Sequence, residues 1–313
     1  MNHYESVKSQ IHGPVVGLLT PFSKDGSVDY ESLVPYIEHQ LAAGLDVLAF
    51  SPMVSSLCVL TTAETLAVAA RTKQIVGNRA LVLGSTRGDS PLETFNLLRG
   101  FETAGLDGAF IFPGYIGPKP DIYLRMLLTC CTITSLPLLG FSVSIEFDRR
   151  FGGLSWMDID HWQRLAETPQ IIGLKDDTGN TKGRLAVAKQ FPNRFVIVGP
   201  GMPDRYIRVH HLPAQAELTS IGDLDMSAER RFHDALGARN EQDACTIMTR
   251  AMNCLERINV VGDCGWGIEP AQTIAYCRGL LDSPAMRPPL PTLTSPQIKA
   301  IHELINAYDD QSC

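Results

Sequence analysis

Short apolar runs alternate with helical patterns through the first 224 residues, and this alternation constrains the fold more than any other feature of the chain. The strand-like runs recur about every thirty residues, as in successive β-α units. They occupy 15–19, 47–50, 80–84, 108–112, 136–141, 171–174, 195–198 and 218–221. Helical patterns follow most of them, at 30–43, from 62, at 91–104, up to 127, at 156–166 and at 183–189. Eight such units predict an α/β fold, a (β/α)8 TIM barrel.

Beyond residue 225 the pattern is purely helical. Helical periodicity covers 227–236, 242–255, 271–281 and 295–307. This is more helix than a barrel needs. We therefore predict a barrel over 1–224 and a C-terminal helical extension over 225–313 that packs on it. The proline-rich segment 287–291 is interpreted as a rigid linker between helices.

Composition excludes several classes of function. The 313 residues include 44% hydrophobic and 19% charged residues, and the net charge is −7 without any basic run. Nucleic acid and anionic membranes are therefore unexpected partners. The sequence shows no long uncharged apolar segment, and its first residues are polar, so neither a membrane span nor a signal peptide is predicted. The eight cysteines show no metal-binding spacing, which favours reduced thiols in a cytoplasmic protein without a metal.

The sixth strand-like run carries the residue with the clearest chemical potential. The apolar segment 171–174 leads directly into Lys175, Asp176 and Asp177, and a Thr-Gly-Asn turn follows at 178–180. In a barrel, the C-terminal ends of the strands form the face that carries the chemistry. Desolvation at that position disfavours the ammonium and favours the neutral amine that attacks a carbonyl carbon. The alternative is an ion pair of Lys175 with Asp176 or Asp177 at the end of a strand.

Four segments carry a family resemblance, in matching order and spacing along the chain. They are Leu-Thr-Pro-Phe at 19–22 with Asp-Gly-Ser-Val-Asp at 25–29, Gly-Leu-Asp-Gly-Ala at 105–109, Ile-Gly-Leu-Lys-Asp at 172–176 with Thr-Gly-Asn at 178–180, and Met-Arg-Pro-Pro-Leu at 286–290. With them the chain resembles the dihydrodipicolinate synthase / N-acetylneuraminate lyase family.

The resemblance implies a TIM barrel with three extra C-terminal helices, assembled as a homotetramer (a dimer of dimers), without a cofactor. It also implies a class I aldolase mechanism, in which Lys175 forms an imine with the ketone of pyruvate or another small-molecule 2-oxo acid. The protonated imine stabilises a carbanion at the adjacent carbon, so that a carbon–carbon bond is made or broken, or water is lost.

The loop after the second strand departs from the family. Where the family binds the substrate carboxylate with Gly-Thr-Thr-Gly-Glu, this chain has Pro52, Met53, Val54, Ser55 and Ser56. Pro52 removes a backbone donor, and Met53 and Val54 replace both threonine hydroxyls. Only Ser55 and Ser56 can restore donors. The four residues 53–56 remain the candidates for substrate binding.

The proton relay implied by the resemblance is also altered. The family's second tyrosine after strand four falls on Ile116, although a one-residue shift gives that place to Tyr115. At the end of strand five, the family's Tyr-Asn pair becomes Phe141 and Ser142. Phenylalanine keeps the ring but carries no proton. Lys175, Phe141 and Tyr115 therefore occupy the catalytic positions, with Ser142 as a substrate contact. Alternatively, Phe141 and Ile116 fill the pocket of a protein that no longer catalyses.

The loop after strand five is rich in charge. The family's arginine, which binds the carboxylate of the second substrate, corresponds to Arg150 after a short insertion, or to Glu146 without a gap. Glu146 or Asp148 can supply an acid or base, and Arg149 or Arg150 an anion clamp. The alternative is a solvated charged loop.

After strand eight, Ile221 is a candidate substrate contact, and Asp223 either binds a substrate hydroxyl or, more simply, caps the next helix. Two functions remain. One is a Schiff-base lyase, an aldolase or hydro-lyase acting on a 2-oxo acid, with a bulkier and less polar substrate than in the enzymes of lysine synthesis. The other is a catalytically silent barrel that binds a small ligand or scaffolds an oligomer. Such a scaffold would tolerate Lys175→Arg.

Overall fold

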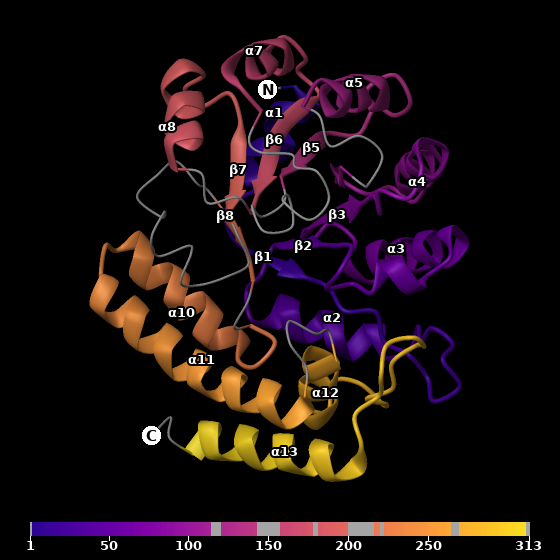
Figure 1. Cartoon of the computed structure of the whole chain (residues 1–313), viewed down its shortest axis with the longest axis vertical. Coiled ribbons are helices and arrows are strands. Elements are labelled where there is room, and N and C mark those ends of the chain that lie inside the picture. Colours follow the sequence, from indigo (N-terminus) through magenta and orange to yellow (C-terminus); the bar gives the residue numbers. More distant parts are fainter. Residues whose placement is uncertain are drawn as a thin grey trace.

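The predicted TIM barrel is confirmed. A computed structural model describes residues 2–113, 120–142, 157–177, 181–199, 216–219, 222–263 and 269–310. Eight parallel strands close into a ring in which each strand pairs with its neighbour in sequence and the last pairs with the first (Figure 1). They are β1 (Gly13–Gly17), β2 (Val47–Ala49), β3 (Leu81–Ser85), β4 (Gly108–Ile111), β5 (Leu138–Ser142), β6 (Ile171–Asp176), β7 (Val196–Gly199) and β8 (Ala216–Leu218).

The helices of the described part surround the ring and continue beyond it. They are α1 (His3–Gln10), α2 (Leu33–Ala42), the short 3-10 helix η1 (Leu57–Val59), α3 (Thr62–Val76), α4 (Pro91–Thr103), α5 (Pro120–Cys130), α7 (Ile159–Ala166), α8 (Thr181–Gln190), α10 (Met226–Gly237), α11 (Glu241–Gly262), α12 (Glu269–Cys277) and α13 (Ser295–Asp310). Helix α3 begins with a reciprocal capping box formed by Thr61 and Glu64. None of these helices combines the length and apolar character needed to cross a membrane.

Successive strand residues point to opposite sides of the barrel wall. Val15 belongs to the apolar cluster inside the ring, whereas its neighbour Val16 belongs to the cluster under the surrounding helices. In β6 a register shift against β5 interrupts this alternation, so that Ile172 lies inside and Leu174 outside although they are two residues apart. Both faces of the sheet are therefore apolar, which explains why the strands appear in the sequence as continuous apolar runs.

Helix α1 closes the end of the barrel at which the strands begin. Its Val7 is buried, and together with Ile11 it joins the apolar cluster inside the ring. Lys8 fixes the helix by donating a hydrogen bond of 2.9 Å to the carbonyl of Asn193. The sequence did not predict this helix, since it carries few apolar residues.

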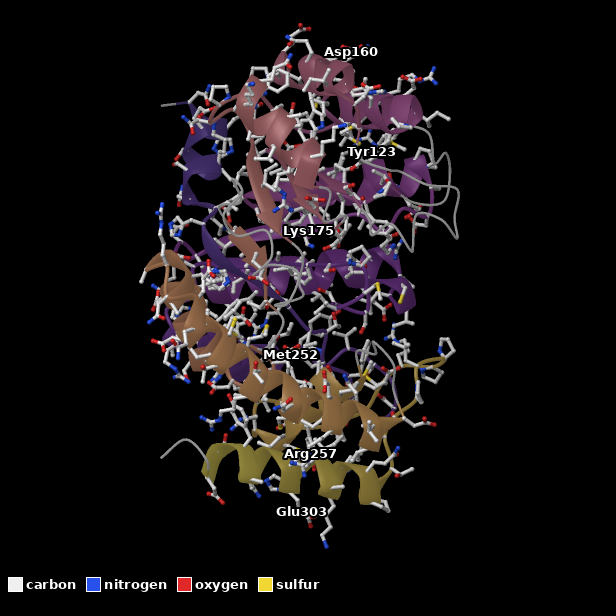
Figure 2. All side chains as sticks on the ribbon, turned by 60° about the vertical axis from the view of Figure 1, so that its left-hand side comes forward. Tyr123, Asp160, Lys175, Met252, Arg257 and Glu303 are labelled. Carbon is white, nitrogen blue, oxygen red and sulfur yellow. The ribbon has the colours of Figure 1, made fainter. Side chains whose placement is uncertain are left out.

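The C-terminal helices have an apolar cluster of their own. Phe232 of α10, Ile258 of α11 and Ile301 of α13 are fully buried members of it. Helices α11 and α13 lie side by side at the end of the molecule farthest from α7, as Figures 1 and 2 both show. This separate cluster is consistent with a helical extension, and the boundary at residue 224 remains a prediction.

Three predicted boundaries are wrong. Strand β8 covers Ala216–Leu218 and not 218–221, because a buried glutamate, Glu217, interrupts the apolar run. Helix α7 begins at Ile159 and not at 156, because Asp158 caps it by accepting hydrogen bonds from the backbone of Asp160 and His161. Helix α11 continues past 255 to Gly262.

Arg287 anchors the C-terminal segment on the first barrel loops. Its guanidinium forms two hydrogen bonds of 2.8 Å to the carboxylate of Glu64. It also donates to the carbonyl oxygens of Gly26 at 2.8 Å and Val59 at 3.1 Å, and lies 5.2 Å from the ring centroid of Phe22. The segment that we interpreted as a linker is therefore also an anchor, and it brings the first and last family-like segments together.

Candidate functional site

Lys175 lies at the C-terminal end of the sixth strand, on the inner side of the barrel. It is the penultimate residue of β6 and aligns with Phe141 of β5 and Val198 of β7. Only 2% of its surface is exposed, and it lies well inside the outline of the molecule (Figure 2). A lysine is rarely buried to this extent unless it is paired or functional.

The ammonium of Lys175 forms an ion pair with Asp177. The contact joins Nζ to Oδ1 of the carboxylate, and the side chain of Asp177 is 27% exposed. The backbone N–H of Asp177 donates to the carbonyl of Ser142 at 3.0 Å, which holds this residue against the end of β5. The ion pair considered as an alternative in the sequence therefore exists, with Asp177 as the partner of the lysine.

Phenylalanine rings also lie close to the Lys175 ammonium. Nζ lies 5.5 Å from the ring centroid of Phe141, which allows a cation–π interaction. Phe141 meets Phe112 and Phe110 edge to face, with ring centroids 5.1 Å and 6.3 Å apart. The wall supplies aromatic surface and no exchangeable proton, so of the side chains described in contact with Nζ, Asp177 is the one that can take a proton.

Asp176, which lies between Lys175 and Asp177 in the sequence, faces the opposite way. Asp176 accepts from Arg184 of α8, with Nε 3.0 Å from Oδ2 and Nη2 in contact with the same oxygen. Both side chains are fully buried. This second ion pair attaches α8 to β6 and thereby fixes the strand end that carries Lys175.

In the loop after β2, polar groups bond mainly within the loop. The hydroxyl oxygen of Ser55 accepts from the backbone N–H of Ser51 at 2.9 Å, and the hydroxyl of Thr20 donates to the carbonyl of Ser55 at 2.6 Å. Ser56 is buried and adopts a left-handed conformation with φ of 54°. Ser55 therefore shapes the loop, although its hydroxyl hydrogen can still be donated to a ligand.

The two apolar replacements in this loop differ in exposure. Val54 packs over Gly17 at the end of β1, with Cγ1 3.1 Å from the position that a Cβ on Gly17 would occupy. Met53 is 58% exposed. Both offer apolar surface where the resemblance implies hydroxyl groups.

The remaining predicted site residues divide into two groups. Ser142 is buried at the end of β5, where its carbonyl accepts from Asp177. Others lie outside the described residues and stay predictions: Tyr115, Ile116, Glu146, Asp148, Arg149, Arg150 and Ile221.

The predicted helix cap at Asp223 is wrong. Helix α10 is capped by Asp225, whose carboxylate accepts from the backbone N–H of Ala228 at 2.9 Å. Burial raises the pKa of Asp223 to about 7. The contact of Asp223 with a substrate hydroxyl stays a prediction.

The sequence alone presents Asp177 as one of two possible ion-pair partners of Lys175, and the structure places its carboxylate on the lysine ammonium. A signal was present, because residues two apart in a strand lie on the same side. The spacing from 175 to 177 therefore brings the carboxylate to the amine, whereas Asp176 points away. Beyond this site, Glu217, Glu229 and His233 form a group with the composition of a metal site.

Relatives with assigned activities cover the chain to different extents. The 4-hydroxy-tetrahydrodipicolinate synthase of Neisseria meningitidis serogroup B is 27% identical over 189 residues, which are 60% of this chain and 63% of the relative. The match thus spans less than two thirds of that protein. The synthase of the same name from Persephonella marina is 24% identical over 282 residues, 89% of this chain and 92% of the relative.

A solved structure shows the same fold. YagE, a prophage protein of E. coli K12 from the dihydrodipicolinic acid synthase family, was solved in complex with pyruvate. It superposes with a TM-score of 0.80 at 18% identity, over 95% of this chain and 98% of YagE. The dihydrodipicolinate synthetase family model matches residues 10–308. Together with the closed barrel and the lysine at the end of β6, this match shows that the chain belongs to the dihydrodipicolinate synthetase family.

Proposed function

We propose that this protein is a Schiff-base lyase in which Lys175 forms an imine with a 2-oxo acid such as pyruvate. The observation that carries the proposal is a buried lysine at the C-terminal end of a barrel strand, in contact with one carboxylate, Asp177. Taking an ion pair out of water costs free energy, so such a pair contributes little stability by itself. A chemical role accounts for its position at the catalytic face.

Asp177 can move the protons that imine formation requires. The carboxylate first takes a proton from the Lys175 ammonium, and the neutral amine adds to the ketone carbon to give a carbinolamine. The carboxylic acid then protonates the carbinolamine hydroxyl, which leaves as water. The products are a protonated imine and the Asp177 carboxylate, so protons and charge balance. Asp177 thus substitutes for the tyrosine relay that Phe141 cannot provide.

The apolar surroundings favour a less polar substrate than that of the lysine-synthesis enzymes. Phe141, Phe112 and Val54 offer carbon surface to a bound molecule. The named synthases and the pyruvate complex of YagE support a 2-oxo acid as the imine-forming partner. We propose an aldolase or hydro-lyase reaction, with the selectivity for the second part of the substrate set by this apolar lining.

A catalytically silent barrel is the second candidate. It is favoured by the loop after β2, where the Ser55 hydroxyl accepts a hydrogen bond from within its own loop. A scaffold of this kind keeps the fold and needs no reactive amine.

Borohydride trapping separates these two functions. The protein is incubated with pyruvate and a panel of larger 2-oxo acids, reduced, and mapped by peptide mass spectrometry. We expect a reduced adduct on Lys175 that is absent from Lys175→Ala and Lys175→Arg but present in Lys189→Ala, which alters an exposed lysine of α8. The absence of an adduct with every 2-oxo acid would favour the scaffold.

We also propose that the protein is cytoplasmic, on the basis of its cysteine pattern, and that it forms homotetramers, on the basis of the family resemblance. Light scattering of the purified chain at several concentrations measures the assembly. A mass that stays at that of one chain would contradict the tetramer.

A further inference from the structure

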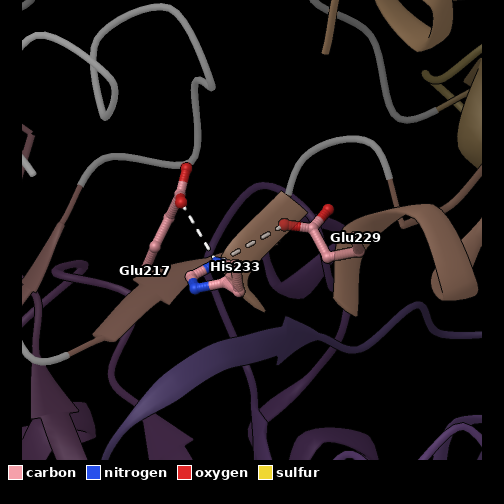
Figure 3. Close-up of side chains that lie close together, drawn as sticks. All are labelled: Glu217, Glu229 and His233. Carbon is pink, nitrogen blue, oxygen red and sulfur yellow. Dashed lines mark ion pairs between the residues drawn. The ribbon is translucent and has the colours of Figure 1, made fainter. Parts of the chain in front are cut away.

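Strand β8 and helix α10 bring three metal-ligating side chains together outside the catalytic pocket. Figure 3 shows Glu217 of β8 on one side of His233, and Glu229 of α10 on the other. Nε2 of His233 lies 3.2 Å from a carboxylate oxygen of Glu217 and 3.8 Å from one of Glu229. One ligand atom from each residue lies within 4.8 Å of the other two. The three atoms therefore converge on one point.

The group is buried and consists of two carboxyl groups and one imidazole. Both carboxylate side chains are 0% exposed and that of His233 is 8% exposed. Among the described residues, neither carboxylate oxygen of Glu217 accepts a hydrogen bond. Burying a carboxylate without hydrogen bonds costs free energy, and coordination of a metal ion is one way to offset this loss. Glu217 therefore indicates that the structure has a place for a cation.

Electrostatics agree with this conclusion. Burial and the negative charge of Glu229 raise the pKa of Glu217 well above its usual range, while the positive charge of Lys175 acts in the opposite direction. Burial and the nearby charge of Arg230 lower the pKa of His233 to about 4. The neutral imidazole is the form in which histidine binds a metal.

Two features hold the ligands in place. Glu229 and His233 are four residues apart on α10, so they share one face of the helix. The backbone N–H of Gly222 donates to one oxygen of Glu229 at 2.8 Å, and the other oxygen faces His233. Hydrogen bonds of this kind orient the ligands in protein metal sites.

We propose that Glu217, Glu229 and His233 bind a divalent transition-metal ion such as Zn²⁺. Ligands about 2.0–2.2 Å from a tetrahedral zinc ion lie roughly 3.3–3.6 Å apart, and this range is close to the separations around His233. One imidazole and two carboxylates favour Zn²⁺, Mn²⁺ or Co²⁺ over Mg²⁺, which prefers oxygen ligands alone. The ion cross-links β8 to α10. Binding of the ion does not require the imine chemistry proposed for Lys175.

Metal titration tests the site directly. The full chain is stripped with a chelator and titrated with Zn²⁺ by calorimetry and with Co²⁺ by visible absorption. We expect one saturable ion per chain, ligand-field bands from Co²⁺, and a higher melting temperature with Zn²⁺ but not with Mg²⁺. Glu217→Gln and His233→Gln should each weaken binding by roughly a hundredfold or more, because each removes a direct ligand, and the loss of an outer contact alone typically costs about 10–100-fold.

His161→Gln is the matched control. His161 also contacts two carboxylates, but Nε2 meets Asp121 at 3.1 Å and Nδ1 meets Asp158, so these groups lie on opposite sides of the ring and do not converge. Binding in His161→Gln should equal that of the wild type. Because His233 is slightly exposed whereas Glu217 is fully buried, its variant also tests the site if Glu217→Gln fails to fold. No saturable binding, or binding that survives His233→Gln, would overturn the proposal.

Discussion

The Lys175 ammonium and the Asp177 carboxylate contact each other on one side of β6, while Asp176 between them points to the other side and pairs with Arg184. Strand alternation produces this arrangement, because residues two apart share a face. Three consecutive residues thus form two ion pairs with different tasks. The inner pair lies at the end of β6 inside the barrel, and the outer pair attaches α8.

Asp177→Asn should slow imine formation while leaving the fold intact. The amide keeps the size of the side chain but cannot take the lysine proton, and positioned acid–base groups contribute about 10²–10⁴-fold to rates. The rate of borohydride-trapped adduct formation with pyruvate measures the effect. Asp160→Asn, an exposed substitution on α7, is the control and should match the wild type. An unchanged rate in Asp177→Asn would show that another group moves the proton.

Arg184→Met should destabilise the protein strongly. The substitution removes the guanidinium that neutralises the buried carboxylate of Asp176, and breaking a buried pair in this way costs about 3–5 kcal/mol. Urea denaturation gives the free energy of unfolding. Arg79→Met breaks a pair with Glu38 in which both side chains are about half exposed, and should cost less than about 1 kcal/mol. Equal losses in the two variants would contradict the role assigned to the buried pair.

Glu64→Gln should have a pH-dependent effect on stability. The hydrogen bonds from Arg287 are the main reason that the pKa of Glu64 falls from 4.5 to about 2. An acid with a lowered pKa in the folded state stabilises the protein above the unfolded pKa, and this contribution is lost as pH falls toward the folded pKa.

The wild type should therefore be more stable than Glu64→Gln by about 1–2 kcal/mol at pH 6. The difference should shrink between pH 4.5 and about 2, the interval between the two pKa values. Denaturant titrations of both proteins across this interval measure it. A difference that stays constant with pH would show that the charge of Glu64 contributes nothing.

Gly173→Ala should disrupt the catalytic strand. A Cβ at this position of β6 would collide with the backbone carbonyl oxygen of Val196 in β7, so one strand must shift. Because Lys175 lies two residues further along β6, we expect a lower melting temperature together with a lower yield of trapped adduct. Gly237→Ala at the end of α10 meets no atom within 4 Å and should be neutral or stabilise by about 0.5–1 kcal/mol. Similar melting temperatures for the two variants would contradict this expectation.

The barrel could be predicted from the sequence because its strands are apolar on both faces. The exceptions have physical causes. Helix α1 buries few side chains and lacks a clear apolar stripe. Strand β8 has three residues, and because one of them is the charged Glu217, its sequence does not form an apolar run. A buried charge in a strand is understandable only when its partner is known, and that partner, His233, lies on the following helix.

The sequence predicts the position of Lys175 in the candidate site, but it predicts few of the contacts around the lysine. The position of the lysine follows from the order of the strands, and Phe141 follows from the register of β5 with β6. The hydrogen bond from Ser51 to Ser55 depends on how one loop folds back on itself, and no spacing in the sequence specifies it. Asp177 lies two residues from Lys175, but the same spacing fits an ordinary surface ion pair, and only the burial of the lysine that it contacts distinguishes the two.

Arg287 also bears on the order in which the protein is made. The first loops of the barrel, at Gly26 and Val59, receive their hydrogen bonds from a residue translated near the end of the chain, and β1 finds one of its two neighbours only when β8 appears. The N-terminal β-α units therefore leave the ribosome with contacts still unmade. A nascent chain that stalls before β8 exposes an open sheet edge to chaperones and proteases, and one that stalls between β8 and Arg287 lacks the hydrogen bonds to Gly26 and Val59.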